Sequence, residues 1–188
     1  MKLLIVESPG KVKKIQSFLG PEFRVMASVG HVRDLPDKEM GLAPPDFQLH
    51  YLPTVRGQKV LADLTKAVKM AEKVYLATDP DREGEAIAWH LAEALGLQAP
   101  QRVTFTEITE KAVKAALENP RPLDLNLIRA QEARRGLDRL VGYTVSPQLS
   151  RLKGASLSAG RVQSPALRLV AERERGGSGF QKLHPPWS

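Results

Sequence analysis

Four carboxylates stand at every second position directly after a short apolar run. The run, residues 74–77, has the length and composition of a buried strand, and Pro80 prevents that strand from continuing. The acids are Asp79, Asp81, Glu83 and Glu85. Crowded carboxylates repel one another unless a cation is present, and their hard oxygens suit Mg²⁺. We predict a Mg²⁺ site made by Asp79, Asp81 and Glu83; the alternative is a solvated acidic turn whose glutamates complement a helix dipole.

A second group of candidate residues follows the apolar run at the start of the chain. Glu7 stands at the carboxyl end of an expected strand over residues 2–6, and Ser8-Pro9 is typical of the start of a helix. Lys11 then falls in the first helical turn, where a cation opposes the helix dipole. A phosphate bound at the helix N-terminus would explain this placement, and an ordinary surface lysine is the alternative.

The elements that must position these residues alternate between strand and helix. The segments expected to be strands are 2–6, 23–29, 74–77 and 102–108, and those expected to be helices include 9–19, 59–73 and 109–118, with a further helix after the acids. This order predicts an α/β fold with a parallel sheet flanked by helices. Residues 36–57 are rich in proline and indicate an irregular surface loop. In open sheets of this kind, ligands bind at the carboxyl ends of the strands, where Glu7 and Asp79 stand.

Charge is distributed unevenly along the chain. Residues 121–175 hold 11 lysines and arginines against 5 acids, whereas residues 1–120 hold 16 of each, so most of the net charge of +7 lies in the later segment. That segment has a purely helical period, with a helix expected over 125–141 and a second one beginning near Pro165. The asymmetry favours a polyanionic partner, most simply nucleic acid; a solvated basic face is the alternative.

Composition excludes several classes of protein. The absence of cysteine rules out disulfides and thiolate metal sites. The apolar run after Met1 and Lys2 is too short for a signal peptide, and no stretch approaches the length of a membrane span. We therefore expect a cytoplasmic protein. Residues 175–179 contain three glycines and one serine and are typical of a flexible linker.

Five blocks of sequence, taken in order, resemble the type IA DNA topoisomerases of the bacterial topoisomerase I kind. The blocks are Glu7-Ser-Pro-Gly-Lys11, Ser28-Val-Gly-His31, residues 77–90 around Asp79-Pro-Asp81-Arg-Glu83, Ala133-Arg-Arg-Gly-Leu-Asp138-Arg, and Leu157-Ser-Ala-Gly-Arg-Val-Gln-Ser164. The resemblance covers residues 1 to about 175. It implies a Rossmann-like topoisomerase-primase (Toprim) domain over 1–120 and a helical DNA-binding segment over 121–175, which is part of the domain that carries the single-stranded DNA groove. Residues 176–188 would be a linker and tail.

The resemblance implies Mg²⁺-dependent cleavage and religation of single strands, with relaxation of negative supercoils, by a bacterial, nucleoid-associated monomer. Glu7 would act as general acid or base at the 3′-oxygen of the cut, and Lys11 would stabilise the scissile phosphate. Glu7, Asp79, Asp81 and Glu83 would handle Mg²⁺. The positions that match DNA-contacting ones are His31, Arg134, Arg135, Asp138, Tyr143, Ser158, Ala159, Gly160, Arg161, Val162 and Gln163.

The sequence also departs from the family pattern. The motif of the nucleophilic tyrosine is absent, because Tyr51, Tyr75 and Tyr143 lie in other contexts. We therefore expect this chain to be inactive alone and to act together with the missing C-terminal topoisomerase domains. Ser150 stands where family members often carry an aromatic side chain.

Three other functions remain open on the sequence. A Toprim nuclease or primase would share Glu7 and the acidic block but not residues 133–164. A non-catalytic nucleic-acid binding module would be compatible with every block. A phosphohydrolase with a nucleophilic aspartate would leave Glu7 and Lys11 unexplained.

Overall fold

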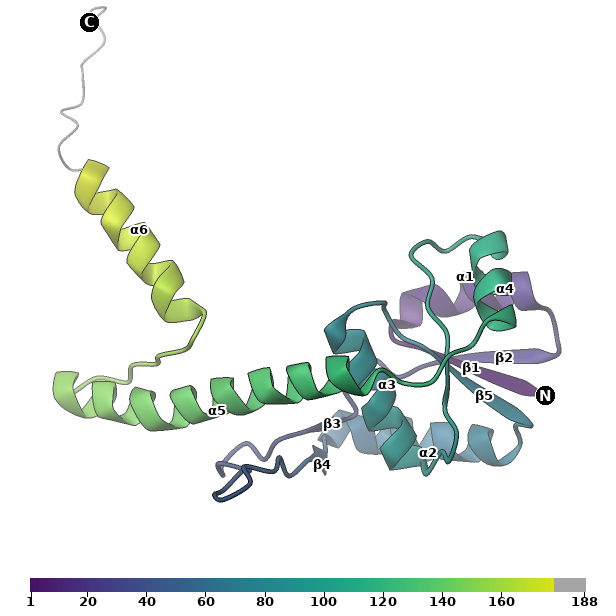
Figure 1. The fold of residues 1–188 in the computed structure, drawn as a ribbon, viewed down its shortest axis with the longest axis horizontal. Helices are drawn as coiled ribbons and strands as arrows, with labels where there is room; N and C mark the ends of the chain where they lie inside the picture. The colour runs from purple at the N-terminus through teal and green to yellow at the C-terminus, as the bar shows by residue number, and fades with distance from the viewer. Residues whose placement is uncertain (178–188) are drawn as a thin grey trace, which may run out of the picture. The chain divides into compact units, whose positions relative to one another are not determined.

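The structure, a computed structural model, describes residues 1–177 and contains a four-stranded parallel sheet. The strands are β1 (Lys2–Val6), β2 (Phe23–Ala27), β5 (Lys73–Ala77) and β6 (Gln101–Arg102), in the spatial order β2-β1-β5-β6 (Figure 1). β1 takes a central place because residues 3–6 are all apolar and buried, as in a strand covered on both faces. Val6 pairs with both Ala27 and Ala77, so these three strands end level with one another.

Helices cover both faces of the sheet. α1 (Pro9–Leu19) and α4 (Glu110–Glu118) pack on one face, and α2 (Val55–Lys69) and α3 (Arg82–Leu95) pack on the other (Figure 1). Successive side chains of β1 point to opposite faces, so Leu4 and Val6 enter the core beneath α1 and α4, whereas Leu3 and Ile5 enter the core beneath α2 and α3. The predicted α/β fold with a flanked parallel sheet is confirmed.

A short antiparallel pair lies outside the main sheet. β3 (Arg33–Asp34) pairs with β4 (Leu52–Pro53), and the residues between them are mostly irregular. The predicted loop over 36–57 therefore extends too far, and the helix predicted over 59–73 is α2, which occupies residues 55–69. Thr54 explains the earlier start, since its hydroxyl caps the helix by accepting a 2.9 Å hydrogen bond from the Gly57 N–H.

Two strands are shorter than their apolar patterns predict. The strand predicted over 23–29 ends at Ala27, since Val29 has a φ of 61°, which strand residues do not adopt. The strand predicted over 102–108 consists only of Gln101–Arg102, and residues 104–107 form a loop. Phe105 in that loop and Ile108 after it still pack against the core. The apolar pattern therefore predicts their packing correctly, although the backbone there is not a strand.

The chain divides into two compact units, Met1–Arg134 and Arg135–Ser188, and the division falls within helix α5 (Leu125–Lys153). α5 runs beyond the predicted 125–141 and contains Pro147. In the second unit, the hydroxyls of Ser146 and Ser150 on α5 accept hydrogen bonds of 2.9 and 3.0 Å from the N–H groups of Ala159 and Leu157. These bonds tie the segment before α6 to the later turns of α5.

Helix α6 (Gln163–Gly177) completes the described part of the second unit. Gly176 and Gly177, predicted to open a linker, belong to this helix instead. The rest of the predicted linker and tail, residues 178–188, lies outside the described residues. Within residues 1–177, no helix combines the length and the apolar character needed to cross a membrane.

A buried ion pair connects helix α3 with strand β6. Glu85 and Arg102 are 1% and 0% exposed, and the Arg102 Nε donates a 3.0 Å hydrogen bond to the Glu85 carboxylate. The same carboxylate accepts hydrogen bonds from both terminal nitrogens of Arg121 and from the Asp124 N–H, at 2.7–2.9 Å. Burial alone would raise the pKa of Glu85, but these hydrogen bonds and the Arg102 charge together lower it. Glu85 is therefore a structural anion of the core and not part of a solvated acidic turn.

We expect Glu85→Ala to destabilise the chain by about 3–5 kcal/mol, because it leaves the Arg102 guanidinium buried without its counter-ion. Urea unfolding followed by circular dichroism measures the change. The control is Glu22→Ala, which removes an exposed glutamate that pairs with Lys2 at 3.4 Å and should alter the free energy of unfolding by no more than about 0.5–1 kcal/mol. Equal losses in the two variants would contradict a structural role for the buried pair.

Candidate active site at the carboxyl edge of the sheet

Three of the predicted site residues meet where β1 and β5 end. The two strands are neighbours in the sheet, so Glu7 and Asp79, which follow them, come to the same edge. Lys11 lies in the first turn of α1, and its Nζ forms an ion pair and hydrogen bond with the Asp79 carboxylate. Glu7, Lys11 and Asp79 are therefore brought together from two segments that lie about seventy residues apart in the sequence.

The environment of Glu7 raises its pKa. Burial is the largest cause, and the negative charges of Asp79 and Asp81 add to it. The Asp79 backbone N–H and the charge of Lys11 act in the opposite direction without cancelling the rise. A carboxyl group whose pKa lies closer to neutral can both hold and release a proton, which suits a general acid or base.

The buried Arg102 side chain holds the backbone of the acidic loop through hydrogen bonds. Its Nη1 donates to the Thr78 carbonyl at 2.8 Å and to the carbonyls of Leu76 and Val103, and its Nη2 donates to the Asp79 carbonyl at 2.8 Å. Sequence reasoning missed Arg102, although an arginine at the start of a run that packs into the core is itself an unusual signal. Because the guanidinium binds the main chain of Asp79, it determines where the Asp79 carboxylate can lie.

Local contacts within the loop restrict it further. The Asp81 side chain caps α3 by accepting a 2.6 Å hydrogen bond from the Gly84 N–H, and the Thr78 hydroxyl donates to the Gly84 carbonyl. A Cβ at Gly84 would lie 2.0 Å from the Asp79 carbonyl oxygen, so only glycine fits there. The turn between β5 and α3 is therefore fixed by backbone contacts on both sides.

The four acids of the motif do not form a single cluster. Asp79 and Asp81 lie near Glu7, Glu83 lies with an Oε1 3.4 Å from the Nε2 of His31, and Glu85 is buried in the core. Among residues 1–177, no three His, Asp or Glu side chains are arranged as a ready set of metal ligands. The donor chemistry still fits a hard cation, since Asp79 and Asp81 bring carboxylate oxygens near Glu7, and their negative charges contribute to its raised pKa.

His31 reaches this edge through a sharply bent loop. Val29 and Gly30 have φ values of 61° and 84°, in the left-handed region that a β-branched residue rarely adopts. The His31 ring meets the buried His90 ring edge-on at 5.8 Å, and the His90 ring in turn contacts that of Trp89 at 4.7 Å. The predicted His31 therefore lies with the acidic loop, held by helix α3.

His31 and Arg134 belong to the first unit, of which Arg134 is the last residue, and the other predicted DNA-contacting residues belong to the second. There, Arg161 donates through Nε to Asp138 at 2.8 Å, and Arg139 stacks on the Tyr143 ring at 4.7 Å. The Gln163 amide donates to the carbonyl and hydroxyl of Ser158 at 2.8 Å. The predicted residues placed on α5 are Arg134, Arg135, Asp138 and Tyr143. Those in the segment leading into α6 are Ser158, Ala159, Gly160, Arg161 and Val162, and Gln163 is the first residue of α6.

Comparison with known proteins gives matches over nearly the whole chain. A family model for the Toprim domain matches residues 2–108, and a model described as DNA topoisomerase matches residues 122–184. The chain is 62% identical over 181 residues to "DNA topoisomerase I, plasmid" of Xylella fastidiosa (strain 9a5c), a match that covers 96% of this chain and 27% of that protein. It is 53% identical over 182 residues to "DNA topoisomerase 1" of Rickettsia bellii (strain RML369-C), covering 93% of this chain and 23% of that protein.

A solved structure of full-length topoisomerase I from Thermotoga maritima, in a monoclinic crystal form, is also similar. Its TM-score is 0.85 and its sequence identity 44%, and the match covers 95% of this chain and 31% of that one. The chain therefore spans about a quarter of the length of the two curated relatives, at 27% and 23%.

We expect Gly84→Ala to be destabilised by about 1–3 kcal/mol, since the new methyl group would overlap the Asp79 carbonyl that Arg102 holds in place. Thermal unfolding measures the loss. Gly10→Ala is the matched control, because the nearest atom to its added Cβ is the Ser8 Oγ at 3.7 Å and alanine favours a helix. A Gly84→Ala variant as stable as Gly10→Ala would mean that the turn is not constrained as described.

The raised pKa of Glu7 predicts a pH-dependent effect of Glu7→Gln. The native state binds the Glu7 proton more tightly than the unfolded chain does, because the native pKa lies above the ordinary value of 4.5. Glu7 therefore lowers the stability of the native state as the pH rises from 4.5 through the native pKa. The glutamine variant should therefore be more stable than the unaltered chain at pH 7, and the gain should disappear below pH 4.5. Urea unfolding at pH 4 and pH 7 tests this; a constant difference, or a loss at pH 7, would contradict it.

Proposed function

Because the chain belongs to the type IA DNA topoisomerase family, we propose that it supplies the metal- and phosphate-handling part of a site that cleaves and rejoins one DNA strand. The observation that carries the proposal is the meeting of Glu7, Lys11 and Asp79 at the carboxyl edge of the sheet. An acid with a raised pKa can transfer a proton, and a cation can stabilise the charge of a phosphate, so these groups are suited to phosphodiester transfer. The enzyme would be a cytoplasmic, nucleoid-associated monomer.

Glu7 would move the proton at the leaving oxygen. As an attacking nucleophile forms a bond to phosphorus, the bond between phosphorus and the 3′-oxygen would break, and a protonated Glu7 carboxyl would donate the proton that this oxygen needs. In religation the resulting carboxylate would take the proton back as the 3′-oxygen attacks the phosphorus and displaces that nucleophile. The raised pKa supports both steps, because it keeps the two forms of Glu7 closer in free energy near neutral pH.

Lys11 would bind the scissile phosphate. Lys11 lies in the first turn of α1, where the dipole of the helix also favours an anion. The ion pair with Asp79 sets the position of the ammonium at the edge of the sheet. Asp79 and Asp81, with Glu7 and Glu83, would hold Mg²⁺, whose charge would offset that of the phosphate.

The basic segment, residues 121–175, would hold the single strand by its phosphates. The segment carries 11 lysines and arginines against 5 acids. The guanidinium of Arg161 already binds Asp138, and that of Arg139 stacks on Tyr143, so these two arginines also shape the surface itself. Arg134 and Arg135 are exposed and would make phosphate contacts.

The nucleophile would come from outside these residues. Tyr75 is buried in the core, and Tyr51 packs edge-on against the His90 ring at 4.4 Å. Tyr143 lies on α5 beneath the Arg139 guanidinium. We therefore propose that the remaining topoisomerase domains supply the tyrosine and that this chain alone forms no covalent link to DNA. A Toprim nuclease or a phosphohydrolase would not account for residues 133–164.

We expect the chain to bind single-stranded oligonucleotides weakly and in a salt-dependent manner. The double change Arg134→Ala, Arg135→Ala should weaken this binding further. Each phosphate contact contributes about −0.7 to the slope of log affinity against log salt, so the slope should flatten by roughly one to two units. Fluorescence anisotropy across a salt series measures both. The control Lys66→Ala, Lys69→Ala removes the same charge from exposed positions on α2 and should leave the slope unchanged. Equal effects of the two double variants would show that net charge, and not this segment, binds DNA.

A further inference from the structure

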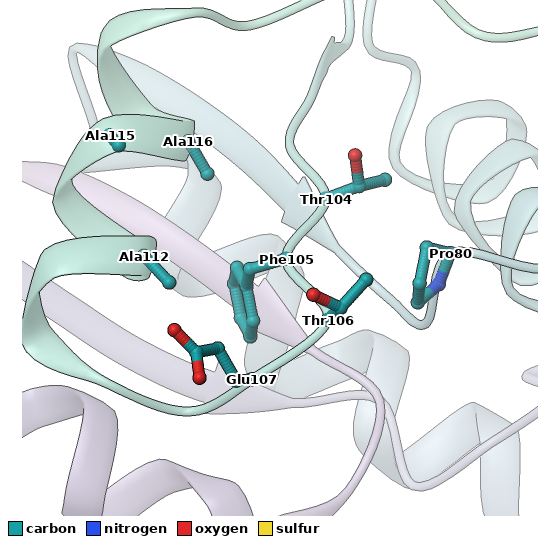
Figure 2. Close-up of a pocket in the computed structure, with 8 residues that line it drawn as sticks. All are labelled: Pro80, Thr104, Phe105, Thr106, Glu107, Ala112, Ala115 and Ala116. Carbon is teal, nitrogen blue, oxygen red and sulfur yellow. The ribbon is translucent and has the colours of Figure 1, made fainter.

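A hollow of about 360 Å³ opens beside the acidic loop (Figure 2). One wall is Pro80, which stands between Asp79 and Asp81, and the opposite wall is the face of α4 that carries Ala112, Ala115 and Ala116. The loop that follows β6 forms the rest. The hollow therefore borders the candidate active site but uses none of the side chains assigned to it above.

The lining of the hollow is mostly apolar and includes three polar side chains. Figure 2 shows the Phe105 ring between α4, whose Ala112 and Ala116 side chains point toward it, and the threonines of the loop. Phe105 packs against the core on one side, which fixes the ring. Thr104, Thr106 and Glu107 supply hydroxyl and carboxylate groups. The Thr109 hydroxyl donates a 3.1 Å hydrogen bond to one oxygen of Glu107 and so orients that carboxylate.

This lining selects the kind of ligand. The residues described as lining the hollow include no lysine or arginine, and the Glu107 carboxylate would repel a phosphate. A planar, uncharged ring with an amino group fits better, because aromatic side chains stack on bases and a carboxylate accepts a hydrogen bond from a base amino group. The volume is at the small end for ligand pockets, which suits one base and not a longer segment.

We propose that this hollow takes one unstacked nucleobase of the DNA strand bound at the active site, with Phe105 as the stacking surface and Glu107 as the acceptor for an exocyclic amino group. The assignment rests on the proposed function, since the strand must pass the acidic loop for a base to reach past Pro80. It predicts a preference for bases that carry an amino group over thymine, which has carbonyl oxygens in the corresponding places.

The test uses a thymine oligonucleotide with a single 2-aminopurine, a fluorescent base that carries an amino group. Binding to the unaltered chain should quench its fluorescence, because the base stacks on Phe105. Ala115 is exposed on α4, so Ala115→Leu fills the hollow without disturbing the core. This variant should abolish the quenching and weaken binding of the labelled strand by about 5- to 150-fold, the range for loss of one stacked base. Ala62→Leu, at an exposed position on α2, should do neither.

Glu107→Gln tests the hydrogen bond separately and leaves the hollow open. It should reduce the preference for the aminopurine strand over the all-thymine strand by about 2- to 10-fold, since the charged acceptor is replaced by a neutral amide. Anisotropy that shows DNA binding without quenching, or quenching that survives Ala115→Leu, would overturn the base site and leave the proposed function standing; the hollow would then be a contact for another protein segment. Absence of any DNA binding by anisotropy would overturn both.

Discussion

The buried pair of Glu85 and Arg102 is the interaction on which the rest of the site depends. Two buried charges cost desolvation free energy, and apolar side chains of similar volume are often at least as stable in such a place. A guanidinium, however, has five N–H donors in a rigid plane, and Arg102 uses them to hold the main-chain carbonyls of Leu76, Thr78 and Asp79. An apolar residue could fill the space but could not hold the turn that presents the acids. The negative charge of Glu85 offsets the cost of burying that guanidinium in the core.

The same carboxylate also anchors the entry into the helical segment. Arg121 and the Asp124 N–H bind Glu85 just before α5 begins, so the turn that carries Asp79 and the start of α5 share one buried anion. Glu85 follows the acidic loop by only a few residues in the sequence, and both are positioned by the first turn of α3. The acidic loop and the first residues of the basic segment are thus both anchored to Glu85 within the first unit.

Sequence patterns predict the strands and helices that form this site better than they predict the hydrogen bonds and ion pairs between them. The parallel sheet, and the meeting of Glu7 with Asp79, follow from two apolar runs that each end in an acid, since parallel strands end at one edge. The burial of Glu85 could not be predicted, because acids at alternate positions look alike whether they face water or an arginine 17 residues away. The left-handed Val29 and the early end of β6 depend on tertiary contacts that periodicity does not record.

Paramagnetic broadening of amide signals by Mn²⁺ tests most directly whether Glu7 and the acidic loop, whose main chain Arg102 binds, form one metal-binding site. Mn²⁺ prefers the same oxygen ligands as Mg²⁺. We expect the strongest broadening at Glu7, Asp79 and Asp81, with Glu83 close behind, and we expect the double change Asp79→Asn, Asp81→Asn to abolish it. Broadening centred on any other group of residues, or broadening that survives the double change, would contradict the assembly of the site around the Arg102-held turn.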